Sequence, residues 1–293
     1  MTARPFLHTT PGEILGDTVE QRVVIPFRGD IARQFRLSLP TSIDALLDHP
    51  ATYEAFAQDE YMPYWAELWP SALMLGQALA QHVWPADMAG EVLDVGCGLG
   101  LSGLVALALG MQVVFSDYDA AALDFAAGNA RLNGFQQFRT LLLDWRCPPD
   151  GLQVPLLLAA DVIYEGRHIQ PLVRLMDRVL SPAGECWLSD PDRPQRQEFQ
   201  LALTAQGFEF EAMPVTLERP EQPTVRGTVY RIRRAAFEPC SAEDGSLRSQ
   251  PNFLTLQQPP RLVKMSPPNG CLRPKDAAQI TPPNRGVIQP SIL

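Results

Sequence analysis

The amino-acid sequence predicts a doubly wound α/β fold, with seven strands in a mostly parallel sheet and an antiparallel edge strand. Between residues 91 and 235, apolar segments of strand length alternate with segments of helical spacing, which is typical of a sheet with helices on both faces. The early strands are apolar almost throughout, as expected of parallel strands buried on both sides. No helix separates the last two strands, so we expect them to form an antiparallel hairpin.

The elements follow in chain order. Residues 20–25 and 34–39 predict short strands, and residues 42–56 and 71–83 predict helices. Pro70 stands where a first-turn proline is tolerated. The seven sheet strands are expected at residues 91–95, 112–116, 138–143, 156–160, 185–189, 208–213 and 225–232. The helices between them are expected at residues 101–109, 120–133, 169–180 and 195–206.

Composition divides the chain into three parts. The hydrophobic fraction of 46% is sufficient for a sizeable core. Residues 236–293 hold ten of the 28 prolines and only two aromatic residues, too little apolar surface to offset the entropy of ordering them. We therefore expect an N-terminal extension at 1–59, an α/β domain at 60–235 and a Pro-rich, disordered tail at 236–293, with a docking segment as the alternative for the tail.

Charge and cysteine usage exclude several classes of protein. The net charge of −9 argues against nucleic acid as a partner. The start of the chain lacks the apolar core of a signal peptide, and the uncharged residues 95–116 are interrupted by glycines, which predicts strand, turn and helix in place of a membrane span. Five widely spaced cysteines without a CxxC motif predict no zinc site and a reducing compartment. We expect a cytoplasmic protein without a metal or a membrane partner.

A glycine-rich turn, Asp94-Val-Gly-Cys-Gly-Leu-Gly100, follows the first sheet strand. Glycines let the backbone approach a ligand, toward which the N–H groups of the next helix point. Asp117 lies 21 residues after Gly96, at the tip of the second strand, where a carboxylate can bind both hydroxyls of a ribose. Asp119 is available to cap the following helix. The third glycine comes one residue too early for a dinucleotide motif, and the pattern better fits a nucleoside with a cationic amino-acid arm.

Four motifs in this order resemble the seven-β-strand S-adenosylmethionine-dependent methyltransferases: EVLDVGCGLG, FSDYD, LLLDW and AADVIY. Their protein-lysine methyltransferase branch is the closer resemblance. It carries Trp-Pro before the first strand (Trp69-Pro70), Asp-Trp after the third (Asp144-Trp145) and an Asp-x-x-Tyr motif after the fourth (Asp161 to Tyr164). The resemblance covers roughly residues 60–234 and implies a Rossmann-like methyltransferase domain with S-adenosylmethionine as its cofactor.

The resemblance also implies which residues bind the cofactor. The turn would line the methionine arm, Asp117 would hold the ribose, and Trp69 would close over the cofactor. Trp145 and Ala160 would flank the adenine, beside which Asp144 would either bond the adenine amine or cap a turn. The implied set is Trp69, Asp94, Gly96, Cys97, Gly98, Gly100, Asp117, Asp144, Trp145 and Ala160.

For the acceptor, the resemblance implies the side-chain amine of a protein lysine. Asp161 would attract and orient the lysine, and Tyr164 would accept an N–H bond or offer a ring face; the alternative for both is a strand-end cap. His168 is interpreted as a surface residue at a helix start, with proton transfer as the alternative. The segments PYWAELWP and SDPDRPQ resemble lysine methyltransferases that act on an electron-transfer flavoprotein subunit, which makes that subunit one possible substrate.

Two other functions stay open at this point. The first is methyl transfer to the amine of a small molecule, and the second is a non-catalytic module that binds the cofactor or serves as a scaffold. The Asn/Asp-Pro-Pro-Tyr/Phe motif typical of adenine or glutamine methylation is absent from the sequence.

Overall fold

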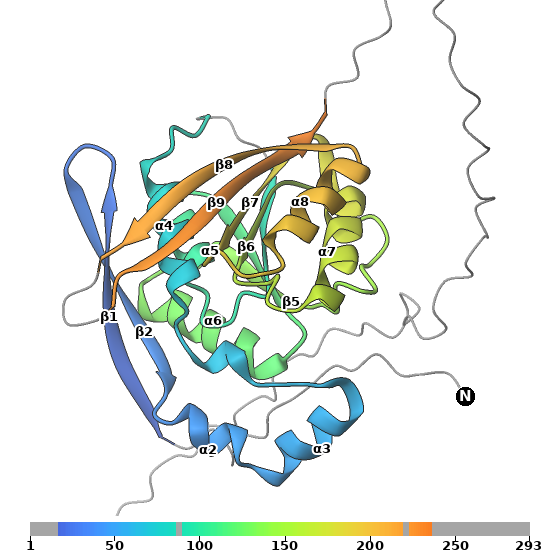
Figure 1. Cartoon of the computed structure of the whole chain (residues 1–293). Helices are drawn as coiled ribbons and strands as arrows, with labels where there is room; N and C mark the ends of the chain where they lie inside the picture. The colour runs from blue at the N-terminus through green and yellow to red at the C-terminus, as the bar shows by residue number, and fades with distance from the viewer. Residues whose placement is uncertain (1–16, 86–89, 219–222, 236–293) are drawn as a thin grey trace, which may run out of the picture.

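The computed structural model describes residues 17–85, 90–218 and 223–235 (Figure 1). The tail predicted at residues 236–293 lies outside the described residues.

A seven-stranded sheet occupies the centre of the molecule, with the strand order β5-β4-β3-β6-β7-β9-β8 (Figure 1). The strands β3 to β7 are parallel, whereas β9 is antiparallel to both β7 and β8. The predicted fold is confirmed, and β9 is inserted between β7 and β8, which leaves β8 at the edge. The strands are β3 (Glu91–Val95), β4 (Gln112–Asp117), β5 (Phe138–Leu142), β6 (Val154–Ala160), β7 (Leu180–Asp190), β8 (Phe208–Leu217) and β9 (Val225–Arg234).

Helices cover both faces of the sheet. One face packs against α4 (Pro70–Gln81), α5 (Leu101–Ala108) and α6 (Ala120–Leu132), and the other against α7 (Gly166–Val179) and α8 (Arg196–Ala205) (Figure 1). Successive side chains of a strand point to opposite faces, so Val92 belongs to the first hydrophobic cluster and its neighbour Leu93 to the second. This explains why the parallel strands are apolar at nearly every position.

The uncharged residues 95–116 fold into a turn, helix α5 and strand β4, as predicted. Leu104 and Val105 of α5 are fully buried, which accounts for the apolar character of the stretch. Within the described ranges, no helix has the length and apolar composition needed to cross a bilayer.

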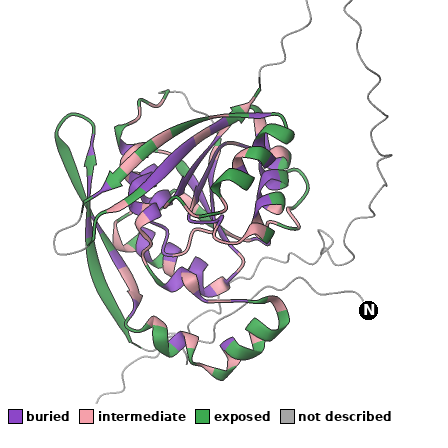
Figure 2. Cartoon of the chain, viewed as in Figure 1, coloured by how far each residue is buried: buried purple, intermediate pink, exposed green. Residues whose placement is uncertain are grey.

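The residues before the sheet form a separate hairpin. Strand β1 (Thr18–Phe27) pairs antiparallel with β2 (Ile31–Pro40). Ile25 and Leu37 on its inner face are fully buried in the cluster around α4, whereas much of the outer face is exposed (Figure 2). The N-terminal extension thus contributes to the same core as the sheet.

The single helix expected at residues 42–56 is instead two helices, α2 (Ile43–Leu47) and α3 (Pro50–Asp59). The residue before a proline is disfavoured in the helical region, and His49 is extended, with ψ of 136°. Its side chain accepts a hydrogen bond from the N–H of Ala51 and so caps α3. The break directs α3 toward the end of the sheet where the functional side chains gather.

Candidate functional site

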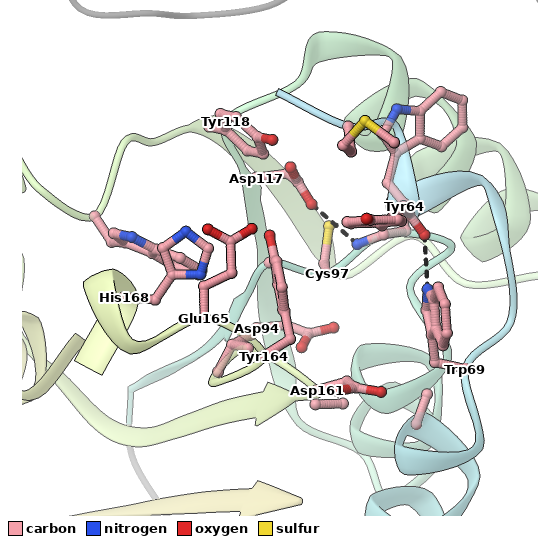
Figure 3. A pocket seen from close by; sticks show the side chains of 18 of the residues that line it. Tyr64, Trp69, Asp94, Cys97, Asp117, Tyr118, Asp161, Tyr164, Glu165 and His168 are labelled. Carbon is pink, nitrogen blue, oxygen red and sulfur yellow. Dashed lines mark hydrogen bonds between the residues drawn. The ribbon is translucent and has the colours of Figure 1, made fainter. Parts of the chain in front are cut away.

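The carboxyl ends of β3 to β7 meet at one edge of the sheet, where their loops surround a cavity of about 640 Å³ (Figure 3). The chain leaves β3 toward β4 on one side and returns to β6 on the other. Such a reversal of strand order opens a crevice, the usual ligand site of open α/β sheets. Residues 59–72, before and at the start of α4, complete the wall.

All twelve residues that the sequence analysis assigned to binding or catalysis line this cavity. The structure therefore brings the predicted set together, while their individual roles stay predictions. The cavity also contains residues that the sequence analysis missed: Asp59, Glu60, Tyr64, Arg146, Arg167 and Arg193.

The glycine-rich turn approaches other backbone closely. A Cβ atom at Gly98 would lie 3.4 Å from the carbonyl oxygen of Trp65, and the φ of Gly98 is +50°. Gly100, with a φ of +86°, is the N-cap of α5. Glycine is favoured at both positions because L-residues rarely adopt a positive φ. The thiol of Cys97, in the same turn, stays protonated because burial raises its pKa well above the usual value.

Asp117 ends β4 and points toward this turn. Its Oδ2 accepts a hydrogen bond from the N–H of Gly98 at 3.1 Å, and its Oδ1 accepts one from the N–H of Asp119, also at 3.1 Å (Figure 3). Burial raises the pKa of Asp117 to about 7. Asp119 caps α6 by accepting from the N–H of Ala121 at 2.8 Å, as predicted, so Asp117 is not needed as the cap.

A second buried acid lies on the neighbouring strand. Asp94 is 2% exposed, and its Oδ2 accepts from the N–H of Gly103 at 3.0 Å. Burial raises the pKa of Asp94 to about 7, and the charge of Asp117 adds to this effect. Burial makes it costly to ionise the two acids beside the glycine turn, and a ligand with a cationic arm and ribose hydroxyls would supply both opposite charge and donors. The residues present fit the S-adenosylmethionine that the resemblance implies.

Asp144 caps a turn, one of the two alternatives predicted for it. Its Oδ1 accepts from the backbone N–H of Arg146 at 2.9 Å, and its carboxylate also pairs with the guanidinium of Arg146. The same guanidinium donates to both carboxylate oxygens of Asp59 at the end of α3, at 2.9 and 2.8 Å. Arg146 therefore links α3 to the loop after β5, a contact across 87 sequence positions that no local pattern could reveal.

Asp161, directly after β6, is held in an uncommon conformation. Its φ is +58°, in the left-handed region, and its N–H donates to the carbonyl of Ser189 on β7 at 2.9 Å. Its side chain is 5% exposed, and its Oδ1 accepts from the Nε of Arg193 at 2.6 Å. Its Oδ2 is buried and has no hydrogen-bond partner among the described residues. A positive φ in a residue other than glycine is a strained conformation that is concentrated at functional sites.

Aromatic rings form a continuous wall along the cavity. The ring centroids of Trp69 and Tyr64 are 6.0 Å apart, those of Tyr64 and Tyr164 are 5.6 Å apart, and the series continues through His168 to Trp145. We call these five residues the aromatic wall. The indole N–H of Trp69 donates to the backbone carbonyl of Tyr64 at 2.7 Å, which holds the indole against the segment that carries Tyr64 (Figure 3).

His168 is half-buried within this wall, so its interpretation as a surface residue was wrong. Burial lowers its pKa, so the imidazole is neutral at pH 7, and its Nδ1 has no hydrogen-bond partner in the described part of the chain. Burial likewise raises the pKa of Tyr164, which therefore keeps its phenolic proton. Both rings thus present neutral surfaces to the cavity.

Comparison with known proteins matches the chain to one protein family. A family model described as "Lysine methyltransferase" matches residues 56–204. The ribosomal protein L11 methyltransferase of Geobacillus kaustophilus is 31% identical over 175 residues, which cover 56% of this chain and 53% of that protein. The histone-arginine methyltransferase METTL23 of Xenopus laevis is 30% identical over 42% of this chain and 56% of its own length. The electron transfer flavoprotein beta subunit lysine methyltransferase of Danio rerio is 27% identical over 58% of this chain and 66% of its own. The chain spans about half the length of the first two relatives.

Proposed function

The chain belongs to the lysine methyltransferase family, and on that premise we propose that it transfers a methyl group from S-adenosylmethionine to the side-chain amine of a lysine in a protein. The observation that carries the proposal is the buried Oδ2 of Asp161, which has no hydrogen-bond partner among the described residues and belongs to a residue that lines the same cavity as Asp94 and Asp117. A buried carboxylate oxygen without a donor favours a ligand that brings a positive charge and an N–H group.

On the donor side, Asp117 would accept hydrogen bonds from the ribose hydroxyls, and the turn from Gly96 to Gly98 would lie against the methionine arm. Trp145 and Ala160 would flank the adenine. S-adenosylmethionine supplies a methyl carbon activated by a positively charged sulfur. That charge would lower the pKa of Asp94 and Asp117 from about 7, so both acids would be ionised in the complex.

On the acceptor side, a bound lysine must lose its extra proton before transfer, because an ammonium nitrogen has no lone pair. Asp161 would accept one N–H of the amine and align its lone pair with the methyl carbon, and the ring of Tyr164 would cover the amine from the side. Exclusion of water by the aromatic wall lowers the pKa of a bound amine, so that the proton leaves for solvent before transfer. Positioning of this kind supplies much of the rate enhancement in a displacement reaction.

The charge of the cavity favours cationic substrates. Eight carboxylic acids and three arginines are among the residues that line it. Glu60 and Glu165 share a single arginine, Arg167, so together with Glu67 they keep a net negative charge that would attract a basic segment of a protein that carries the target lysine. An electron transfer flavoprotein subunit is the first defined substrate to test, because one relative is named for it.

We propose the cytoplasm as the site of action and residues 60–235 as the methyltransferase domain.

The test is methyl transfer into proteins of a cytoplasmic lysate. The full chain is incubated with S-adenosylmethionine labelled in the methyl group, and the labelled proteins are hydrolysed and examined by mass spectrometry. We expect label in methylated lysine. Asp161→Asn should lower incorporation about a hundredfold while S-adenosylmethionine affinity stays near that of the wild type.

Asp124→Asn is the matched control, because Asp124 is an exposed acid on α6 that does not line the cavity, and it should leave incorporation unchanged. Label only in methylated arginine, or transfer only to small amines, would contradict the proposed acceptor. No transfer to any acceptor would favour a non-catalytic module.

A further inference from the structure

Arg193 lies in the loop after β7 and pairs with the carboxylate of Asp161. We propose that Arg193 is a specificity-determining residue: by holding one oxygen of Asp161, it leaves a single oxygen for the acceptor and so selects an amine over a guanidinium group. The inference rests on the proposed function, since it concerns the acceptor at the same site.

The pair is rigidly placed. The Nε of Arg193 donates to Oδ1 of Asp161 at 2.6 Å, and the backbone N–H of Arg193 donates to Oδ1 of Asp190 at 2.8 Å. Asp161 is in turn fixed to β7 through its N–H bond to Ser189. The backbones of both residues are therefore anchored at the ends of adjacent strands, and their side chains pair in the absence of a substrate.

The two oxygens of Asp161 therefore differ. Oδ1 is occupied by Arg193, whereas the buried Oδ2 has no partner in the described ranges. Both residues line the cavity together with Tyr164. Oδ2 is covered in the structure, so a cation in the cavity would have to displace the atoms that cover it to bind this one unpaired oxygen of the carboxylate.

One oxygen suits the two possible acceptors unequally. A guanidinium is a planar fork that binds a carboxylate best through two parallel N–H···O bonds, whereas an ammonium is a compact charge that a single oxygen can satisfy. An arginine side chain would have to give up half of its preferred contact or displace Arg193. A lysine ammonium would still make its full contact with a single oxygen, and the rings of Tyr164 and Tyr64 could cover its remaining surface.

Arg193 also limits the charge at this point of the cavity. Its guanidinium compensates the Asp161 carboxylate, to which it is bonded within the fold. A lysine is then oriented by a bond to Oδ2 without facing the full, uncompensated charge of a lone carboxylate. The contact with Asp161 gives the arginine of the segment SDPDRPQ a specific task.

The experiment measures binding of side-chain mimics, so that it does not depend on methyl transfer. The full chain, loaded with S-adenosylhomocysteine, is titrated at pH 7 with n-butylammonium and separately with n-butylguanidinium. Affinities are read from the indole N–H signals of the five tryptophans by NMR. We expect the wild type to bind the ammonium at least tenfold more tightly than the guanidinium.

Three variants test whether Arg193 causes the preference for the ammonium. Arg193→Met frees Oδ1 and should lower the ammonium-to-guanidinium ratio at least tenfold, mainly by improving guanidinium binding. Arg193→Lys still donates to Oδ1 and should keep the wild-type ratio. Arg196→Met is the matched control, because Arg196 pairs with Asp192 at 2.9 Å and does not line the cavity; it should change nothing.

The inference is overturned if the wild type binds neither mimic, if it prefers the guanidinium, or if Arg193→Met folds and keeps the wild-type ratio. Should Arg193→Met not fold, the wild-type preference together with its retention in Arg193→Lys supports the inference, and loss of the preference in Arg193→Lys overturns it. The expected ratios without any methylated lysine in the lysate experiment would contradict the proposed function alone. Methylated lysine together with an ammonium-to-guanidinium affinity ratio that is the same in the wild type and in Arg193→Met would contradict this inference alone.

Discussion

Asp117→Asn should affect stability and cofactor binding in opposite directions. The carboxyl of Asp117 is 5% exposed, and burial raises its pKa from 3.8 to about 7. Because one pKa unit corresponds to ~1.4 kcal/mol, ionising this group in the folded protein costs about 4 kcal/mol at pH 8. Asparagine removes that cost, but its amide can replace only one of the two accepted hydrogen bonds, a loss of about 1–3 kcal/mol. We expect a net gain in unfolding free energy of about 2 kcal/mol at pH 8.

The contribution of Asp117 to the unfolding free energy depends on pH. A carboxyl whose pKa is higher in the folded than in the unfolded state binds more protons when folded, so its contribution to stability falls as the pH rises from about 4 to about 7. The wild type without cofactor should therefore lose stability over this range through Asp117, whereas the variant should not. At pH 5 the advantage of Asp117→Asn should have nearly disappeared. Urea unfolding at pH 5 and pH 8 measures both values, with Asp124→Asn as the exposed control.

The same substitution, Asp117→Asn, should weaken cofactor binding. If Asp117 accepts hydrogen bonds from both ribose hydroxyls, loss of its charge should weaken S-adenosylmethionine binding by about 2–4 kcal/mol, roughly 30-fold to 1,000-fold. Calorimetry at pH 8 tests this value. Unchanged affinity would remove Asp117 from the binding site, and a variant less stable than the wild type at pH 8 would refute the reasoning about its burial.

Three further changes have expected outcomes. Gly103→Ala places a Cβ atom 2.3 Å from Cε1 of Phe115 and should lower the unfolding free energy by about 1–3 kcal/mol; a urea midpoint equal to that of the wild type would contradict this packing. Arg146→Met breaks the link between Asp59 and Asp144 and should lower the hydrogen-exchange protection of α3 and weaken cofactor binding about tenfold, whereas unchanged protection would mean that α3 is held by other contacts. A chain that ends at Arg234 should keep its melting temperature within a few degrees, because the composition of residues 236–293 offers little apolar surface to bury; thermal unfolding checks this, and a large drop would show that the tail packs on the domain.

Local patterns predicted the donor side of the site well. The strand that contains Asp94, the glycine turn and the helix after Gly100 are contiguous, so residue order alone places them beside one another. Asp117 could be added because parallel neighbouring strands end at the same edge of a sheet. The break between α2 and α3 is also readable from the sequence, since Pro50 disfavours a helical conformation at His49, although the apolar spacing of residues 42–56 favours one continuous helix.

The sequence by itself determined the alternation of strands and helices and the cavity end of the sheet, because these follow from apolar periodicity, turn residues and strand direction. The twelve candidate site residues were implied by the resemblance of its motifs to those of methyltransferases, and all of them line the cavity. Only the tertiary structure decided which charges pair. Arg193 reaches Asp161 across 32 positions, and Arg146 reaches Asp59 across 87, because β6 and β7 are neighbours and α3 folds back over the loop after β5. In the unfolded chain, a long, flexible side chain can reach many different partners. Its partner in the folded protein is set by strand order and burial, which are properties of the whole fold.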